Sequence, residues 1–330
     1  MRGAWFCSSL LCVLAACAGV SSPQRSAREL APVVSHHQHL LSPASSAVWS
    51  RPPEVLETIT AEKLIEQLDA AGIRRAVVLS VAYLYGDPRR QFDDEYDRVR
   101  AENDWTSAEV SRHADRLVGF CGVSPLKPYA IEELDRCASR LKLRGLKLHL
   151  GNSGVDLRDP QHVARIREVF KAANERRLPI VVHMRTRNPA YGRRDAEIFL
   201  QEIVSAAPAI VIQIAHMAGA GPGYPAHADE AMAVFADAVA ARDPRTKNLY
   251  FDVTTIVTTE TSADNADLIV RRIRQVGAKR VLFGADLSIG GNPPLREAWA
   301  AFRAKLPLTD AEFRTIATNV APYLRGRPSG

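Results

Sequence analysis

The stretch Pro179-Ile180-Val181-Val182-His183 sets the pattern by which we interpret the rest of this 330-residue chain. It is a continuous apolar run without the alternation of a strand that has one solvated face. We therefore expect a strand buried on both faces, as in a parallel sheet. A histidine closes the run. Seven further apolar runs of this kind occur at residues 32–36, 75–81, 116–123, 145–150, 210–216, 249–253 and 280–286.

Helical patterns lie between these runs. One covers residues 61–71 and stops at Gly72, a common C-cap, and another follows Asp159-Pro160, a helix-start signal. The others are expected at residues 107–114, 130–141, 195–206, 226–241, 263–276, 295–305 and 309–321. Eight strands each followed by a helix predict the α/β class, as a single-domain (β/α)8 TIM barrel. An open doubly wound sheet is the alternative, but no Gly-x-Gly-x-x-Gly turn follows any run.

The composition excludes several classes of protein. Hydrophobic residues make up 46% of the chain, which excludes a disordered, collagen-like or coiled-coil protein. The 43 Lys and Arg residues exceed the 37 Asp and Glu residues by only six, and they form no long basic run. We therefore expect a small-molecule substrate and no nucleic-acid partner. A homodimer is among the compatible assemblies.

The N-terminus resembles an export signal. Arg2 precedes an apolar segment at residues 4–16 that is short for a membrane span. Leu14-Ala15-Ala16-Cys17 resembles a bacterial lipobox, in which the cysteine is lipidated. We expect a lipoprotein signal peptide at residues 1–16, a flexible tether at 17–30 and the barrel at 31–326. This arrangement predicts an exported periplasmic or cell-envelope protein that its acyl chains anchor to a membrane. The alternative is an ordinary cleaved signal.

Chemistry-bearing side chains gather at the ends of the predicted strands. Five of the nine histidines lie there, and an aspartate ends the last run: His37, His39, His149, His183, His216 and Asp286. In a barrel these strand ends meet at one mouth, where active sites are built. A single histidine after a strand is more often a loop residue than a ligand. Imidazoles and a carboxylate together suit a divalent metal such as zinc.

The arrangement of motifs resembles the amidohydrolase superfamily, particularly the amidohydrolase-2 branch. That branch includes aminocarboxymuconate-semialdehyde-type decarboxylases and dicarboxylate lactonases. The motifs that carry the resemblance are His37-Gln38-His39, Gly145-Leu146-Lys147-Leu148-His149, Val182-His183, Ile214-Ala215-His216 and Leu282-Phe283-Gly284-Ala285-Asp286. The similarity covers roughly residues 31–325. One departure is Ser35, which stands where relatives commonly carry an aspartate.

The resemblance implies a metal-dependent enzyme. One divalent metal, with Zn²⁺ as the first choice, would be held by His37, His39, His183 and Asp286. Its coordination lowers the pKa of a bound water from about 15.7 toward neutrality. Asp286 would act as general base, and His216 would orient the water or polarise the substrate. A two-metal site bridged by a carboxylated Lys147 is the alternative.

Three functions compete at this stage. The first is hydrolysis of a lactone, ester or amide in a small substrate, whose carboxylate Arg185 would bind after the strand that ends at His183. The second is non-oxidative decarboxylation by nearly the same residues. The third is an inactive barrel that serves as an exported binding lipoprotein. Cys121 and Cys137 do not form a disulfide framework, and a single bridge between them stays open.

Overall fold

Eight parallel strands form the centre of the computed structural model, which describes residues 30–50, 53, 55–286 and 292–325. The chain divides into a unit at Met1–Leu30 and a unit at Ala31–Gly330, and only the second is described below. The predicted signal peptide and Cys17 lie outside the described residues, as does all but the last residue of the predicted tether. Within the described part, no helix is long and apolar enough to cross a membrane.

The strands pair in their order along the chain, from β1 to β8, and every pair is parallel. They are β1 (Val34–Gln38), β2 (Arg75–Leu79), β3 (Leu117–Gly122), β4 (Leu146–His149), β5 (Ile180–His183), β6 (Ile212–Ile214), β7 (Leu249–Asp252) and β8 (Val281–Leu282). Each lies within or overlaps one of the eight predicted runs. The predicted single-domain (β/α)8 barrel is therefore confirmed.

Backbone hydrogen bonds connect the first strand to the segment that follows the last. The His36 N–H donates to the Phe283 carbonyl at 2.7 Å, and the Asp286 N–H donates to the His37 carbonyl at 3.0 Å. The Nδ1 atom of His36 also lies 3.2 Å from the Phe283 oxygen, and its Nε2 accepts from the Ala321 N–H. These contacts bring the strand 1 histidines beside Asp286.

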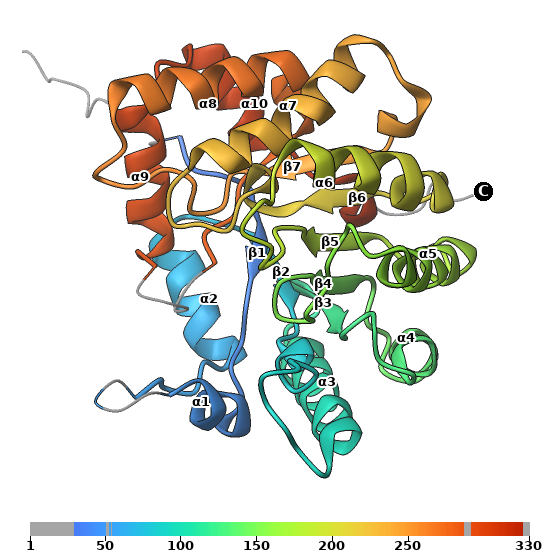
Figure 1. Cartoon of the computed structure of the whole chain (residues 1–330). Helices are drawn as coiled ribbons and strands as arrows, with labels where there is room; N and C mark the ends of the chain where they lie inside the picture. The colour runs from blue at the N-terminus through green and yellow to red at the C-terminus, as the bar shows by residue number, and fades with distance from the viewer. Residues whose placement is uncertain (1–29, 51–52, 54, 287–291, 326–330) are drawn as a thin grey trace, which may run out of the picture. The chain divides into compact units, whose positions relative to one another are not determined.

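Helices surround the strands (Figure 1). In the described part they are α1 (Pro43–Trp49), α2 (Ala61–Ala70), α3 (Glu95–Ser111), α4 (Ala130–Ser139), α5 (Pro160–Glu175), α6 (Arg193–Ile198), α7 (Ala226–Ala240), α8 (Ala263–Val276), α9 (Leu295–Lys305) and α10 (Asp310–Thr318). α6 continues through a π-helical turn at Phe199–Ile203 and a 3-10 turn at Val204–Ala206. The expected helices at 263–276 and 295–305 are confirmed residue for residue. No helix was expected at α1.

The prediction for residues 107–114 was wrong in its extent, because α3 begins at Glu95 and ends at Ser111. The buried face of α3 carries polar side chains, so the apolar repeat that marks an amphipathic helix is weak there. Glu102 and Asn103 are both buried on this face. Asn103 donates to the Gly122 carbonyl and accepts from the Gly122 N–H, so it joins α3 to β3 through the backbone.

The lower half of the barrel interior is apolar. Val77, Leu79, Val118, Phe120 and Val181 point inward from β2, β3 and β5 and form one buried cluster with Val34, Ala215 and Leu324. The C-terminal segment closes this end, because Val320 and Tyr323 pack against the cluster. Inward-facing branched and aromatic side chains fill such barrels and make them solid cores. One polar side chain, Gln213, is buried next to this cluster, and its Oε1 accepts from the Tyr323 hydroxyl at 2.6 Å.

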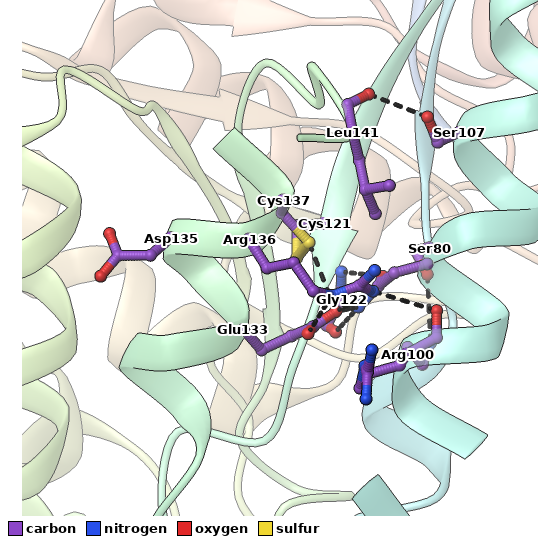
Figure 2. The surroundings of a disulfide bond; sticks show 12 residues. Ser80, Arg100, Ser107, Cys121, Gly122, Glu133, Asp135, Arg136, Cys137 and Leu141 are labelled. Atoms are coloured by element: carbon purple, nitrogen blue, oxygen red, sulfur yellow. Dashed lines mark hydrogen bonds and ion pairs between the residues drawn. A yellow bond between two sulfur atoms is a disulfide. The ribbon is translucent and has the colours of Figure 1, made fainter. Parts of the chain in front are cut away.

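A disulfide joins Cys121 of β3 to Cys137 of α4, so the bridge that the sequence left open is present (Figure 2). Glu133, one helical turn before Cys137, is fully buried beside it. Its carboxylate accepts hydrogen bonds from Asn103 Nδ2 at 2.7 Å and from Arg136 Nε at 2.8 Å. These partners compensate for the burial of the carboxylate and attach α4 to α3 and β3.

Candidate metal centre and active site

The predicted site residues meet in one cavity of about 390 Å³ at the carboxyl ends of the strands. It is lined by His37, His39, Trp49, Leu56, Tyr83, Leu84, Asp87, Arg89, Arg90, Lys147, His149, Asn152, His183, His216, Ala220 and Asp286. Every predicted metal or catalytic residue is in this set. The substrate-binding candidate Arg185 is not, since its Nε donates to His227 Nε2 at 3.1 Å. Its proposed role stays a prediction.

His37 is oriented by a carboxylate that the sequence analysis did not identify. Its Nδ1 lies 3.1 Å from Asp252 Oδ2, and both side chains are buried. A carboxylate at neutral pH only accepts hydrogen bonds, so Nδ1 donates to Asp252 and Nε2 is the acceptor nitrogen of the ring. Burial alone would raise the pKa of Asp252. The contacts with His37, the charge of His216 and the His216 backbone N–H together hold that pKa below its usual range. Such a carboxylate–histidine pair is typical of metal ligands.

His39 and His216 have the same hydrogen-bond arrangement as His37, in which Nδ1 donates and Nε2 accepts. His39 Nδ1 lies 2.6 Å from the Leu79 carbonyl oxygen, and His216 Nδ1 lies 2.9 Å from that of Thr254. Both rings therefore carry the proton on Nδ1 and leave Nε2 as an acceptor. Burial lowers the pKa of His39 to about 3 and that of His216 to about 4, so both are neutral at pH 7. Neutral imidazole is the form that binds metals.

Asp286 supplies the carboxylate of the site. Its Oδ1 lies 3.4 Å from His39 Nε2 and 3.9 Å from His37 Nε2. One ligand atom from each of these residues falls within 4.8 Å of the others. Oδ1 is buried and has no hydrogen-bond partner among the described residues. Burial raises the pKa of Asp286, but nearby His37 and His39 lower it by more, so the group is anionic at neutral pH.

This donor set fits a divalent metal. Two acceptor nitrogens and a carboxylate oxygen face one another, and none of these acceptor atoms can donate to another. A buried oxygen left in this state is unfavourable unless a cation or a donor reaches it. Nitrogen and oxygen ligands of this kind bind Zn²⁺ and similar first-row metals.

Lys147 projects into the same group of side chains from β4. It is 1% exposed, and its Nζ lies 3.1 Å from His37 Nε2. Burial lowers the pKa of Lys147 to about 8, so a substantial neutral fraction exists near pH 8. The lysine thus contacts the nitrogen that we expect to bind metal.

His149 and His183 lie side by side because β4 and β5 are in register at these two residues. Their rings are stacked, with centroids 3.9 Å apart and planes 13° from parallel. His183 also packs edge-on to His216, with ring centroids 5.0 Å apart. It is therefore adjacent to the ligand group, although its ring has no hydrogen-bond partner among the described residues.

Asp252 also organises the turn after β6. Its Oδ1 accepts from the His216 backbone N–H at 2.9 Å, and its Oδ2 accepts from Gln213 Nε2 at 2.7 Å. His216, Met217 and Ala218 all have positive φ, a costly conformation for residues with a Cβ. Asp252, which the sequence analysis did not identify, therefore supports both His37 and the turn after β6. Its signal was present, because Asp252 ends β7 much as Asp286 follows β8.

Charged residues surround the mouth of the cavity. The Asp87 carboxylate, 1% exposed, accepts from Arg89 and from Arg187, which joins the loop after β2 to the loop after β5. Arg90 lines the cavity and donates to the Val48 carbonyl at 2.9 Å. The described residues give Arg90 no acidic partner. Asn152 accepts from Arg187 at 2.9 Å and completes this rim.

Aromatic side chains form part of the cavity wall. Trp49 and Tyr83 line the cavity. Tyr85, Trp105 and Tyr224 are not among its lining residues. Ser35, which replaces the aspartate common in relatives, accepts from Gln38 Nε2 at 2.7 Å. In this chain, support for His37 comes from Asp252 on β7.

Known structures share this fold. A 2,6-dihydroxybenzoate decarboxylase from Rhizobium is 18% identical with a TM-score of 0.57, over 87% of this chain and 96% of that chain. A probable 2-pyrone-4,6-dicarboxylic acid hydrolase from Acinetobacter baumannii, with citric acid bound, is 16% identical with a TM-score of 0.59, over 86% and 95%. A 5-carboxyvanillate decarboxylase from Novosphingobium aromaticivorans, in complex with manganese, is 15% identical with a TM-score of 0.57, over 88% and 94%. At these identities the likeness concerns the fold.

No curated protein sequence matches the chain. The model of the Amidohydrolase family does match, over residues 36–319, a range that includes every histidine of the cavity and Asp286. The match covers most of the chain and contains the barrel from its first strand to α10. This chain therefore belongs to the amidohydrolase family.

Proposed function

We propose that the protein is a metal-dependent hydrolase that cleaves a lactone, ester or amide bond in a small substrate. The observation that carries this proposal is the buried Asp286 Oδ1, which faces the acceptor nitrogens of His37 and His39 without a hydrogen-bond donor. Membership of the amidohydrolase family supports it, and so does the hydrolase from A. baumannii among the similar structures.

We assign His37, His39, His183 and Asp286 as the ligands of one divalent metal, with Zn²⁺ as the first choice. A metal held there supplies Lewis-acid activation of water and of a substrate carbonyl. The Asp286 carboxylate, which is anionic at neutral pH, takes the proton of the attacking water and returns it to the leaving group. His216 Nε2, an acceptor with a fixed tautomer, orients that water. Manganese in two of the similar decarboxylases makes Mn²⁺ the second metal to test.

The arginines at the mouth support a substrate that carries a carboxylate. Arg90 lines the cavity and has no acidic partner among the described residues, and Arg89 also lines it. Guanidinium groups bind carboxylates through paired, charge-assisted hydrogen bonds. We propose Arg90 for this role beside Arg185, the candidate from sequence.

Non-oxidative decarboxylation is the second candidate function. The similar structures include decarboxylases of 2,6-dihydroxybenzoate and of 5-carboxyvanillate, and one fold can carry more than one chemistry. The two functions differ in their products. Hydrolysis transfers oxygen from solvent to the product, whereas decarboxylation releases CO₂. The third function, an inactive binding barrel, is disfavoured because ligand atoms of His37, His39 and Asp286 still lie within 4.8 Å of one another.

The test uses protein reconstituted with Zn²⁺ or Mn²⁺ and a panel of lactones, esters, amides and hydroxybenzoates. We expect turnover with incorporation of ¹⁸O from labelled water. Asp286→Asn should lose at least about 100-fold in kcat while part of the metal remains bound. His183→Ala should lose metal on dialysis, measured by elemental analysis. CO₂ release without ¹⁸O uptake would replace the hydrolase by the decarboxylase, and full metal retention in His183→Ala would remove this ligand.

We also propose export and a lipid anchor at Cys17. The disulfide between Cys121 and Cys137 supports export, because structural disulfides persist in oxidising compartments outside the cytosol. Globomycin treatment should cause accumulation of the unprocessed precursor, and Cys17→Ser should move the protein from the membrane fraction to the soluble fraction. Continued membrane partitioning of Cys17→Ser would contradict the anchor.

A further inference from the structure

The histidines of the cavity differ in which ring nitrogen donates a hydrogen bond and which accepts one. His37, His39 and His216 each place Nδ1 against an oxygen that only accepts, so their Nε2 atoms are acceptors. His149 is reversed. Its Nδ1 accepts from the backbone N–H of Asn152 at 3.1 Å. A neutral ring whose Nδ1 accepts must carry its proton on Nε2, so this ring is a donor where the others are acceptors.

The Nε2–H of His149 is available to the cavity. His149 lines it, and the loop at Gly151 and Asn152 packs against the Nδ1 side of the ring. The ring is held in place by the stacked ring of His183 on one side.

Tyr83 supplies a second donor beside His149. Its ring centroid lies 5.1 Å from that of His149, and its side chain lines the cavity from the segment after β2. Only 2% of the residue is exposed, and its hydroxyl has no hydrogen-bond partner among the described residues. Burial and the charge of Asp286 raise the pKa of Tyr83, so the hydroxyl is protonated at any working pH.

We propose that the His149 Nε2–H and the Tyr83 hydroxyl together bind the substrate oxygen on which negative charge develops, and that His149 is not a metal ligand. This assignment rests on the proposed hydrolase function and adds two residues to it. In hydrolysis that oxygen is the carbonyl oxygen of the scissile group. Preorganised donors directed at such an oxygen stabilise the transition state more than the ground state.

Paired substitutions separate the donor role from ligation. Glutamine has an amide that reaches the position of Nε2, whereas asparagine reaches only as far as Nδ1. We expect His149→Asn to lower kcat by about 100-fold, His149→Gln to restore at least a tenth of it, and both to keep the wild-type metal content. Tyr83→Phe should lower kcat by about tenfold or more with little change in KM. His162→Gln on α5 and Tyr129→Phe are the matched controls and should leave kcat unchanged.

Loss of metal in both His149 variants would overturn the proposal, because it would make His149 a ligand. Equal activity of His149→Asn and His149→Gln, with kcat unchanged in Tyr83→Phe, would also overturn it. The metal contents are measured by elemental analysis on folded protein, with circular dichroism as the check on folding.

A readout independent of turnover keeps this test separate from that of the proposed function. Long-range ¹H–¹⁵N spectra of protein with ¹⁵N-labelled histidine distinguish the two neutral tautomers, and the signal absent from His149→Gln identifies His149. We expect the Nε2–H tautomer, and a shift of its Nε2 resonance on titration with acetate as an oxygen-anion probe. An Nδ1–H tautomer, or no response to acetate, would contradict the donor pair even if hydrolysis were observed. The expected spectra without turnover would contradict only the proposed hydrolase.

Discussion

Asp252 Oδ2 lies 3.1 Å from His37 Nδ1, and the same carboxylate accepts the backbone N–H of His216 through Oδ1. One buried side chain on β7 therefore orients His37, a proposed metal ligand from β1, and anchors the strained turn after β6. The two functions of Asp252 are coupled because each oxygen is occupied. Its removal should affect both the metal and the position of His216.

Asp252→Asn should weaken metal binding by about 10- to 100-fold, the range found when the partner of a ligating histidine is lost. His37 and His216 address different oxygens of Asp252, and an amide replaces one of these oxygens with an NH2 group that only donates, so one of the two hydrogen bonds must break. The measurement is a competition titration with a chelator. Asp243→Asn, in an exposed loop before β7, is the control and should bind metal like the wild type. An unchanged affinity in Asp252→Asn would show that His37 is oriented without this carboxylate.

Reduction of the disulfide should destabilise the barrel. Cys121 and Cys137 are 16 residues apart, and closing a loop of this length contributes about 3 kcal/mol to the free energy of unfolding. Urea unfolding with and without dithiothreitol measures the difference. The double variant Cys121→Ala with Cys137→Ala should be insensitive to the reductant. Identical unfolding midpoints for the oxidised and reduced wild type would contradict this expectation.

His36 should make the protein sensitive to acid. Burial lowers its pKa from 6.5 to about 4 in the folded state, so between these pH values the unfolded chain binds more protons than the folded chain. The free energy of unfolding therefore falls as the pH drops from 6.5 to 4, by an amount on the order of 3 kcal/mol from this group. Above pH 6.5 the group contributes no slope.

Urea unfolding of chelator-treated protein at pH 7 and pH 5 tests this dependence. His36→Gln should be less stable than the wild type at pH 7, because it loses contacts to Phe283 and Ala321. It should also lose less stability on acidification. An equal loss in both proteins would assign the acid sensitivity to other histidines.

Arg90→Gln should impair carboxylated substrates selectively. Losing one charge-assisted contact of about 1.5 to 3 kcal/mol should raise KM roughly 10- to 100-fold for a carboxylated ester. The KM for the matching neutral methyl ester should stay the same. Arg185→Gln tests the candidate from sequence in the same assay, and Arg167→Gln on α5 is the control. A selective effect in Arg185→Gln alone would move the carboxylate site to the loop after β5.

The barrel was predictable because its strands are buried on both faces and so read as continuous apolar runs. The same logic placed His37, His39, His183, His216 and Asp286 at strand ends, and all of them line the cavity. The weakest part of the prediction was α3. Its inner face carries Glu102 and Asn103, whose partners Ser42 and Gly122 are far away in the sequence.

The supporting contacts of the site depend on pairings that no local pattern reveals. Asp252 and His37 are separated by 215 positions, and nothing near either residue indicates the other. The tautomer of His149 depends on a backbone N–H three residues later, which becomes a partner only through the turn after β4. Spacing predicts which residues meet at a barrel mouth. The direction of each hydrogen bond, which distinguishes a metal ligand from a hydrogen-bond donor, follows only from the three-dimensional structure.

The closure of the barrel has a consequence for when the protein acquires its metal. His37 is on the first strand and Asp286 follows the last, and the backbone bonds between these segments bring the two side chains together. A ribosome must therefore synthesise nearly the whole barrel before this ligand pair exists. If the chain crosses a membrane unfolded, the pair first forms on the far side. The ion in the site is then selected by the metal supply of the compartment where folding ends, and cytosolic metal buffering has no part in the choice.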